Sequence, residues 1–145
     1  TFFYASNFSV GVNIFFKENA HLAKLMNGFT DYNVSVDEIH HTQKKDAPSG
    51  TAITIAEDIL SNLKRKNSWI NKTEESPDQL AIFSHRIDPA PGTHSVKYSS
   101  LIDDIEIKHT AHTREGFALG AIEVANWIVQ EKKQGLLNMD DFLKL

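Results

Sequence analysis

One segment, EIHHTQKKDAPSGTAI at residues 38–53, gathers most of the side chains in this sequence that could do chemistry. It holds two adjacent histidines, His40 and His41, and two adjacent lysines, Lys44 and Lys45, followed by a Pro-Ser-Gly-Thr turn. Imidazole and ammonium groups transfer protons and bind anions, and imidazole also binds metal ions. The segment therefore has three interpretations: a metal site, a cradle for an anion, or an ordinary turn with solvated lysines.

A metal site is the interpretation that the spacing supports least. Adjacent residues of a strand point to opposite faces, so His40 and His41 could ligate one ion only beyond the end of a strand. Zinc sites use three or four ligands at helical or turn spacing, and neither HxxxH nor HExxH occurs in this sequence. A third ligand would have to come from His94, His109 or His112. We therefore expect no metal, with a metal-dependent hydrolase as a rival hypothesis.

The turn Ser49-Gly50-Thr51 favours an anion cradle. It lies where a loop becomes a helix, so free backbone N–H groups and the positive end of the helix dipole meet there. Gly50 lets a ligand approach the backbone, and the Thr51 hydroxyl adds a donor. A histidine beside a bound carboxylate favours its protonated form and can donate a proton near neutral pH. A plain helix cap at Ser49 explains the same residues, and loop composition does not separate the two.

Hydrophobic periodicity predicts the elements that position this loop. We expect helices at about 10–27, 50–63 and 115–133 and strands at about 32–39, 80–87, 94–100 and 104–112. Ser9 is the expected N-cap of the first helix, and Gly28 its stop. The last helix should carry Lys132 and Lys133 in its final turn, with Gly135 just beyond its end.

Two further segments are assigned from composition. Residues 2–6, FFYAS, have the character of the end of a buried strand, and residues 67–78, NSWINKTEESPD, that of a polar surface connection. The order of elements predicts an α+β fold, a two-layer sandwich with a mixed, mainly four-stranded open sheet and helices on one face. The uncovered face must be buried elsewhere, and oligomerisation through the sheet is the usual solution.

Composition narrows the class of protein. The chain has 145 residues, 41% of them hydrophobic, which fits one globular unit or a small domain with part of another. The net charge of −4 argues against a nucleic-acid partner, and no apolar run approaches the length of a membrane span. The absence of cysteine removes disulfides and thiolate nucleophiles and suits a cytoplasmic protein. Because Thr1 is not an initiator methionine and opens an apolar run, we expect the later part of a longer protein.

The 38–52 segment closely resembles the signature of the 4-hydroxy-tetrahydrodipicolinate reductase (dihydrodipicolinate reductase) family, E-x-H-H-x-x-K-x-D-A-P-S-G-T-A. Every defined position is met, by Glu38, His40, His41, Lys44, Asp46, Ala47, Pro48, Ser49, Gly50, Thr51 and Ala52. ASNFSVGVN at 5–13 is similar to the family's hinge, and residues 105–128 to its final strand and helix. Arg86, Gly92 and His94 keep the spacing of its R…G-x-H strand pair. One departure is Asp88-Pro89, where the family often has Gly-Asp.

The resemblance implies a reductase that uses NADH or NADPH on a ring dicarboxylate, on the diaminopimelate route to lysine. By matching position, His40 would be the proton donor and acceptor, and Lys44 a second proton donor and charge stabiliser. His41, Gly50 and Thr51 would bind the substrate. The nicotinamide side of the cofactor cleft would be lined by Ala5, Ser6, Asn7 and Phe8. Strand histidines such as His94 are expected to be structural, and Lys45, outside the signature, to be solvated.

The resemblance also implies a domain plan. Residues 1–9 would be the hinge from a Rossmann domain, 10–114 the substrate-binding and oligomerisation domain, and 115–145 a helix that returns to the nucleotide domain. No G-x-G-x-x-G occurs here, so we expect the isolated chain to be inactive. Its last helix should pack on the first helix or on a neighbouring chain. The family implies a cytoplasmic homotetramer, and a dicarboxylate-binding module without catalysis is the alternative function.

Overall fold

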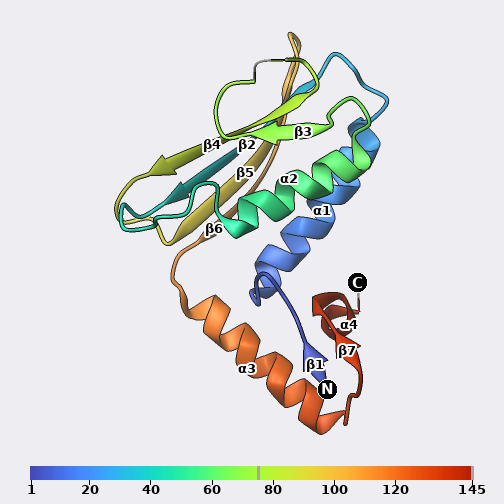
Figure 1. The fold of residues 1–145 in the computed structure, drawn as a ribbon, viewed down its shortest axis with the longest axis vertical. Coiled ribbons are helices and arrows are strands. Elements are labelled where there is room, and N and C mark those ends of the chain that lie inside the picture. The colour runs from blue at the N-terminus through green and yellow to red at the C-terminus, as the bar shows by residue number, and fades with distance from the viewer. Residues whose placement is uncertain (75, 145) are drawn as a thin grey trace.

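The structure, a computed structural model, describes residues 1–74 and 76–144 (Figure 1). Along the chain the elements are β1 (Phe2–Phe3), α1 (Val10–Met26), β2 (Asn33–His40), α2 (Gly50–Asn62), β3 (Ser68–Ile70), β4 (Gln79–Arg86), β5 (Gly92–Ser99), β6 (Asp104–Ala111), α3 (Glu115–Gln130), β7 (Leu136–Leu137) and α4 (Met139–Leu143). Within the described part of the chain, no helix is long and apolar enough to cross a membrane.

The main sheet has five strands in the order β3-β4-β2-β5-β6, with α1 and α2 side by side on one face (Figure 1). β2 pairs with β4 in parallel and with β5 antiparallel, which confirms the mixed α+β sheet. The expected connection at 67–78 instead contributes a fifth strand, β3, parallel to β4. Sequence patterning missed it because a three-residue edge strand is too short to show alternation. Its Trp69 packs against the core.

Side chains on the helix-covered face form rows that cross the strands in register. One row is apolar and comprises Ile82, Val36, Val96 and Ile107. The next is polar and comprises Ser84 on β4, Glu38 on β2, His94 on β5 and His109 on β6. Two residues further along each strand, the hydrophobic core therefore gives way to a polar site.

The helices dock on the apolar rows as their spacing predicts. α2 buries its whole stripe, Ala52, Ile55, Ala56 and Ile59, and Leu63 just beyond its end is also fully buried. Asn19 of α1, fully buried, donates to the carbonyl of Ile55 at 3.0 Å and links the two helices. The N-cap at Ser9 is confirmed, since its hydroxyl accepts from the amide of Val12.

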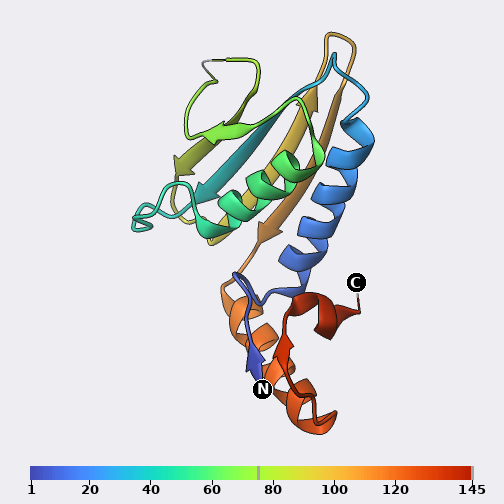
Figure 2. The same cartoon turned by 45° about the vertical axis from the view of Figure 1, so that its right-hand side comes forward.

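The chain termini form a separate arm, shown below the sheet in Figure 2, where β1 and β7 lie beside α3. β1 pairs in parallel only with the two-residue β7. The expectation of a buried strand at the N-terminus was therefore wrong, since Phe2 and Tyr4 keep 63% and 64% of their surface exposed.

The end of α3 also differs from the expectation. The helix ends at Gln130, and Lys132 takes the left-handed conformation with φ of 51°. The amides of Lys132 and Lys133 donate to the carbonyls of Val129 and Ile128, the pattern of a Schellman cap. Lys132 thus occupies the position beyond the helix end, where sequence reasoning placed a glycine.

α3 packs on the hinge rather than on α1. A Cβ on Gly120 would lie 2.0 Å from the carbonyl oxygen of Phe8, so helix and hinge approach as closely as backbones can. Further along, the Trp127 ring meets Phe142 of α4 edge-on, with centroids 5.5 Å apart. The expectation that the helix packs on α1 was wrong, and packing on a neighbouring chain stays a prediction.

Candidate functional site

The signature segment passes from the end of β2 through a loop into α2. β2 is an inner strand, paired on both sides, and its residues Glu38 and His40 point toward the helices. Glu38 is fully buried and His40 is 7% exposed. His41 lies beyond the strand in the loop and is half-buried. The adjacent histidines therefore have different environments, with His40 enclosed and His41 at the surface.

The Glu38 carboxylate is the centre of the site. Its Oε1 accepts from Ser84 Oγ at 2.6 Å, Ser49 N at 3.1 Å and Arg86 Nη2 at 3.4 Å. Its Oε2 lies 3.2 Å from Ser49 N, 3.3 Å from His40 Nδ1 and 3.7 Å from His94 Nε2. Burial alone would raise the pKa of Glu38, but the close contacts with His40 and His94 and the hydrogen bonds from Ser49 and Ser84 hold that pKa well below its usual range. Glu38 is therefore an anion at neutral pH.

His40 presents its two ring nitrogens to different surroundings. Nδ1 is shielded from solvent and faces Glu38 Oε2, at an angle too oblique for a standard hydrogen bond. Nε2 lies beside Gly92 on β5, where an added Cβ would come within 3.3 Å of it. The missing side chain at Gly92 therefore leaves room next to Nε2.

His94, expected to be structural, lies inside the site. Its ring meets the His40 ring edge-on with centroids 5.0 Å apart, and its Nε2 lies 3.2 Å from Ser49 Oγ. Burial lowers the pKa of His94, and contact with Glu38 partly opposes that shift. The sequence did carry a signal: Glu38 follows Val34 and Val36, and His94 precedes Val96 and Tyr98, so both ionisable residues continue the buried face of a strand.

The cradle, meaning the N–H groups of Gly50 and Thr51 at the start of α2, is anchored by Ser49. The Ser49 hydroxyl accepts from the amide of Ala52 at 3.2 Å, so the plain helix cap is present. Its own amide is held by Glu38. Gly50 is exposed, and a Cβ there would meet nothing within 4 Å. In the described part of the chain, the cradle N–H groups form no hydrogen bond and are open to an anion.

The hinge reaches the cradle through Asn7, whose Nδ2 lies 3.4 Å from Thr51 Oγ1. Asn13 Nδ2 donates to the carbonyls of Asn7 and Ser9, which fixes the hinge to the first turn of α1. Phe8 turns away, and its ring stacks on Phe3 with centroids 5.6 Å apart. Two further predicted cofactor residues, Ala5 and Ser6, are half-buried and exposed, respectively. Of the four, the structure brings Asn7 to the cradle.

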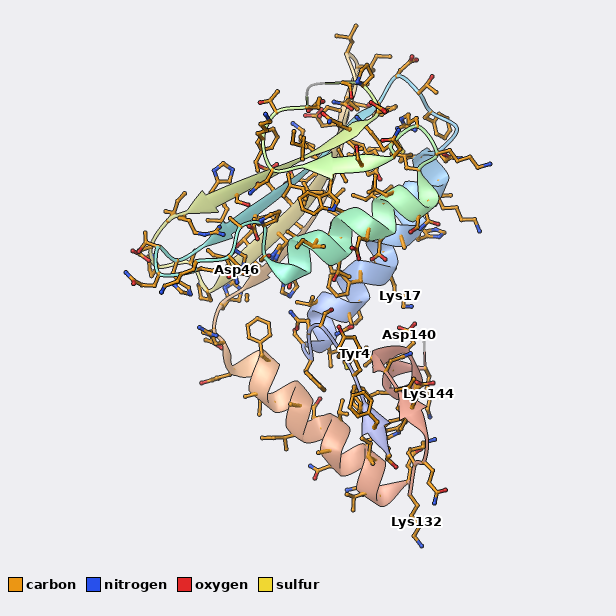
Figure 3. The ribbon with its side chains drawn as sticks, viewed as in Figure 1. Tyr4, Lys17, Asp46, Lys132, Asp140 and Lys144 are labelled. Carbon is orange, nitrogen blue, oxygen red and sulfur yellow. The ribbon has the colours of Figure 1, made fainter. Side chains whose placement is uncertain are left out.

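Lys44 is held by an ion pair with Asp46, Nζ to Oδ1 at 2.9 Å, which lowers the pKa of Asp46. Asp46 lies at the end of the loop nearest α2 (Figure 3). Arg86 steadies the same loop, since its Nε donates to the Lys44 carbonyl and its Nη2 to the Asp46 carbonyl. The charged partner of Lys44 in this structure is therefore Asp46 rather than a group of the Glu38–His40 pair. Lys45 is exposed, as expected.

Asp88, the departure from the family pattern, fastens the other end of the loop. Its Oδ1 accepts from the Thr42 amide at 3.0 Å and its Oδ2 from the Thr42 hydroxyl at 2.6 Å. These bonds hold the pKa of Asp88 below its usual range. The changed turn therefore supports the loop through a different contact.

The metal hypothesis can be tested against this geometry. Ligand atoms of Glu38, His40 and His94 lie within 4.8 Å of one another. However, both Glu38 oxygens already accept hydrogen bonds, and the Arg86 guanidinium beside them is a poor neighbour for a cation. His41, which the hypothesis needed, is not in the group. The donor set fits a proton-holding network better than a metal centre.

Fold and site together define a class: an α+β domain with a buried carboxylate–histidine network beside an open helix N-terminus. The chain belongs to the family described as "Dihydrodipicolinate reductase, C-terminus", whose model matches residues 11–143. A 4-hydroxy-tetrahydrodipicolinate reductase from Christiangramia forsetii is 49% identical over 98% of this chain and 58% of its own length. The reductase of that name from Methanosarcina barkeri is 40% identical over 96% and 52%.

The chain spans about half the length of these relatives. A solved structure, the dipicolinate-bound dihydrodipicolinate reductase from Paenisporosarcina sp. TG-14, shares the fold with a TM-score of 0.65 and 24% identity. The match covers 94% of this chain and 52% of that one. The comparisons confirm the family, while the roles of individual residues stay predictions.

Proposed function

We propose that this chain is the substrate-binding half of an enzyme that reduces 4-hydroxy-tetrahydrodipicolinate to tetrahydrodipicolinate in the diaminopimelate route to lysine. The observation that carries the proposal is the shared carboxylate: Glu38 contacts both His40 and the amide of Ser49. A proton donor and an anion cradle are thereby held together, as reduction of a ring dicarboxylate requires. The names of the relatives support the same reaction.

The substrate's carboxylate would bind at the cradle. The N–H groups of Gly50 and Thr51 and the Thr51 hydroxyl supply donors, and the α2 dipole favours negative charge there. His41, at the surface end of the loop, would contact another part of the substrate. Binding at fixed donors would orient the ring for reaction and stabilise negative charge that develops on it.

His40 would supply and accept the proton. Its imidazolium form is compatible with the Glu38 anion at Nδ1, and Nε2 has room toward Gly92. Lys44 would be the second donor and would stabilise charge once it leaves its ion pair with Asp46. A positioned acid–base group of this kind contributes roughly 10²- to 10⁴-fold to a rate.

The chain's residues fit a nicotinamide dinucleotide at the hinge, because the hinge side chain of Asn7 lies against Thr51 of the cradle. Ala5, Ser6, Asn7 and Phe8 would hold the nicotinamide end of NADH or NADPH. When bound, the dinucleotide supplies the hydride for the reduction. Asn7 would hold the hinge against the cradle through Thr51, while residues 5–6 would border the cofactor.

We infer a cytoplasmic homotetramer that assembles through the uncovered face of the sheet. None of the described helices covers this face (Figure 2). Its cross-strand contacts are largely ionic, with Lys97 bonded to Asp104 at 2.6 Å and His85 to Asp37 at 3.2 Å. Light scattering on the complete protein should give four times the chain mass, and a monomer would contradict the inference.

Dipicolinate binding and turnover test the function. The chain should bind dipicolinate in calorimetry, and Thr51→Val should weaken binding about tenfold, the equivalent of one charge-assisted hydrogen bond. Lys45→Ala is the matched control and should bind as the wild type does. The isolated chain should not oxidise NADH, whereas the complete protein should. Binding without turnover in the complete protein would support the dicarboxylate-binding module instead.

A further inference from the structure

We propose that Glu38 is the positioning residue of this site: it orients the His40 ring through Nδ1 and simultaneously holds the cradle through the amide of Ser49. The inference rests on the proposed function and deepens it. It assigns a role to a signature residue that is fully buried behind His40 and Ser49.

The first half of the role concerns His40. Which ring nitrogen carries the proton is set by the group that the other nitrogen faces. Glu38 Oε2 lies 3.3 Å from Nδ1, without a standard hydrogen bond, so the carboxylate charge favours the proton on Nδ1 and Nε2 is left to exchange one. Gly92 leaves space at Nε2, whereas Nδ1 is shielded. Proton transfer from the imidazolium at Nε2 then leaves a neutral ring of fixed tautomer against the carboxylate.

The second half concerns the cradle. Ser49 N donates to both Glu38 oxygens, at 3.1 and 3.2 Å. This bond fixes the residue before Gly50, and with it the direction in which the first N–H groups of α2 point. Ser49 Oγ is shared between the Ala52 amide and His94 Nε2, so the cap is braced from β5 as well.

Glu38 is suited to both tasks because burial and hydrogen bonds hold its side chain in one position. It is fully buried on an inner strand with a neighbour bonded on each side. Ser84 on β4 and Arg86 beside it hold Oε1, and His94 on β5 approaches Oε2. A functional group is placed most accurately when its support is a rigid element with locked rotamers.

The charged and titratable groups in contact with the His40 ring are Glu38 on its own strand and His94 on β5. The next groups out are Arg86 on β4, which contacts Glu38, and the Lys44–Asp46 ion pair in the loop. Glu38 is the anion that faces the ring directly. Removing its charge therefore makes the imidazolium less favourable, and the alkaline limb of the pH–rate profile should move to lower pH.

The test uses the complete reductase with Glu38→Gln, which keeps shape and removes charge. We expect kcat to fall roughly 100-fold, the size of a lost acid–base contribution. The alkaline limb should move to lower pH and dipicolinate should bind about tenfold more weakly. Glu57→Gln, the same change on the exposed side of α2, is the matched control and should leave all three unchanged.

Glu38→Asp keeps the charge but shortens the reach, and it decides the question should Glu38→Gln not fold. We expect it to lose kcat by about tenfold, since one carboxylate can no longer meet both His40 and Ser49, while its pH–rate profile keeps the wild-type limb. Folded Glu38 variants with a lowered melting temperature but wild-type kcat, limb and dipicolinate affinity would overturn the inference. A wild-type protein that neither binds dipicolinate nor turns over NADH would instead defeat the proposed function itself.

Discussion

The sheet domain (residues 10–111) and the terminal arm (residues 2–9 and 115–143) differ in how they bury apolar surface. Val36, Ile55 and Ile59 of the sheet domain are fully buried between the sheet and its two helices. In contrast, α3 buries only Gly120 and Val124. Exposed apolar side chains remain on the arm at Phe2, Tyr4, Leu119, Ile122, Val129 and Leu136. The comparison teaches that the sheet domain buries a core of its own, whereas the long helix of the arm leaves most of its apolar side chains exposed.

The largest expected effect breaks the sheet domain. Ile55→Ala removes a fully buried side chain between α2 and its neighbours, so the free energy of unfolding should fall by about 3 kcal/mol. Ile122→Ala, the same substitution on the exposed face of α3, should change it by less than about 0.5 kcal/mol. Urea denaturation measures both, and equal losses would refute the proposed contrast between the two regions.

Next in size is the junction of α3 with the hinge. Gly120→Ala places a Cβ 2.0 Å from the Phe8 carbonyl oxygen, so the helix must move and the arm should lose about 2 kcal/mol of local stability. Gly116→Ala is the matched control, because its Cβ would make only an ordinary 3.8 Å contact with Ser9 Oγ. Hydrogen exchange of α3 should speed up in the first variant alone. Unchanged exchange in Gly120→Ala would show that the close approach does not hold the arm.

A smaller effect, dependent on pH, is expected where α4 meets the sheet domain. Figure 3 shows Lys17 and Asp140 facing each other, and they form an ion pair at 2.6 Å. Burial raises the pKa of nearby Asp58 to about 6, and Lys17 opposes that shift. Because this pKa is raised on folding, the contribution to stability is full below about pH 4 and is lost as pH rises through about 6.

Asp58→Asn should therefore stabilise the protein at pH 7.5 by roughly 1 kcal/mol, a figure discounted because solvent screens this half-buried group. The difference from wild type should shrink toward pH 4. Glu123→Gln, which changes an exposed carboxyl on α3, should show no such trend. Thermal melts between pH 4 and 8 provide the measurement, and parallel pH curves for wild type and Asp58→Asn would rule out the buried carboxyl as the cause.

The smallest effect concerns the end of α3. Lys132 has a left-handed backbone, which costs a residue with a side chain more than it costs glycine. Lys132→Gly should raise the stability of the arm by about 0.5 to 1 kcal/mol, seen as slower exchange of the amides near Val129. Lys108→Gly, within β6, should be destabilising instead. A loss of protection in Lys132→Gly would show that the cap depends on the lysine side chain.

Local sequence patterns predicted most of the helices and strands. They missed features that depend on contacts between distant parts of the chain. Helical spacing placed α1 and α2 correctly, because a buried stripe needs no knowledge of what covers it. β3 was missed, since a strand of three residues is defined by its neighbour alone. The strand at Phe2–Phe3 was predicted, but its expected burial was wrong, because it pairs with the short β7 and not within the main sheet. The helix end at Gln130 was missed because Lys132, not Gly135, adopts the capping conformation.

The sequence by itself determined the family and the chemical groups of the site, His40, Lys44 and the Ser49-Gly50-Thr51 turn, because a continuous signature carries them. Only the tertiary structure decided that Glu38 joins them to Ser84 and His94. Ser84 lies 46 positions along the chain from its partner Glu38, and His94 lies 45 positions from its partner Ser49. Strand register brings them into one polar row, and register depends on how whole strands pair. The buried Glu38 carboxylate is therefore surrounded partly by residues from distant strands, which a local sequence pattern cannot identify.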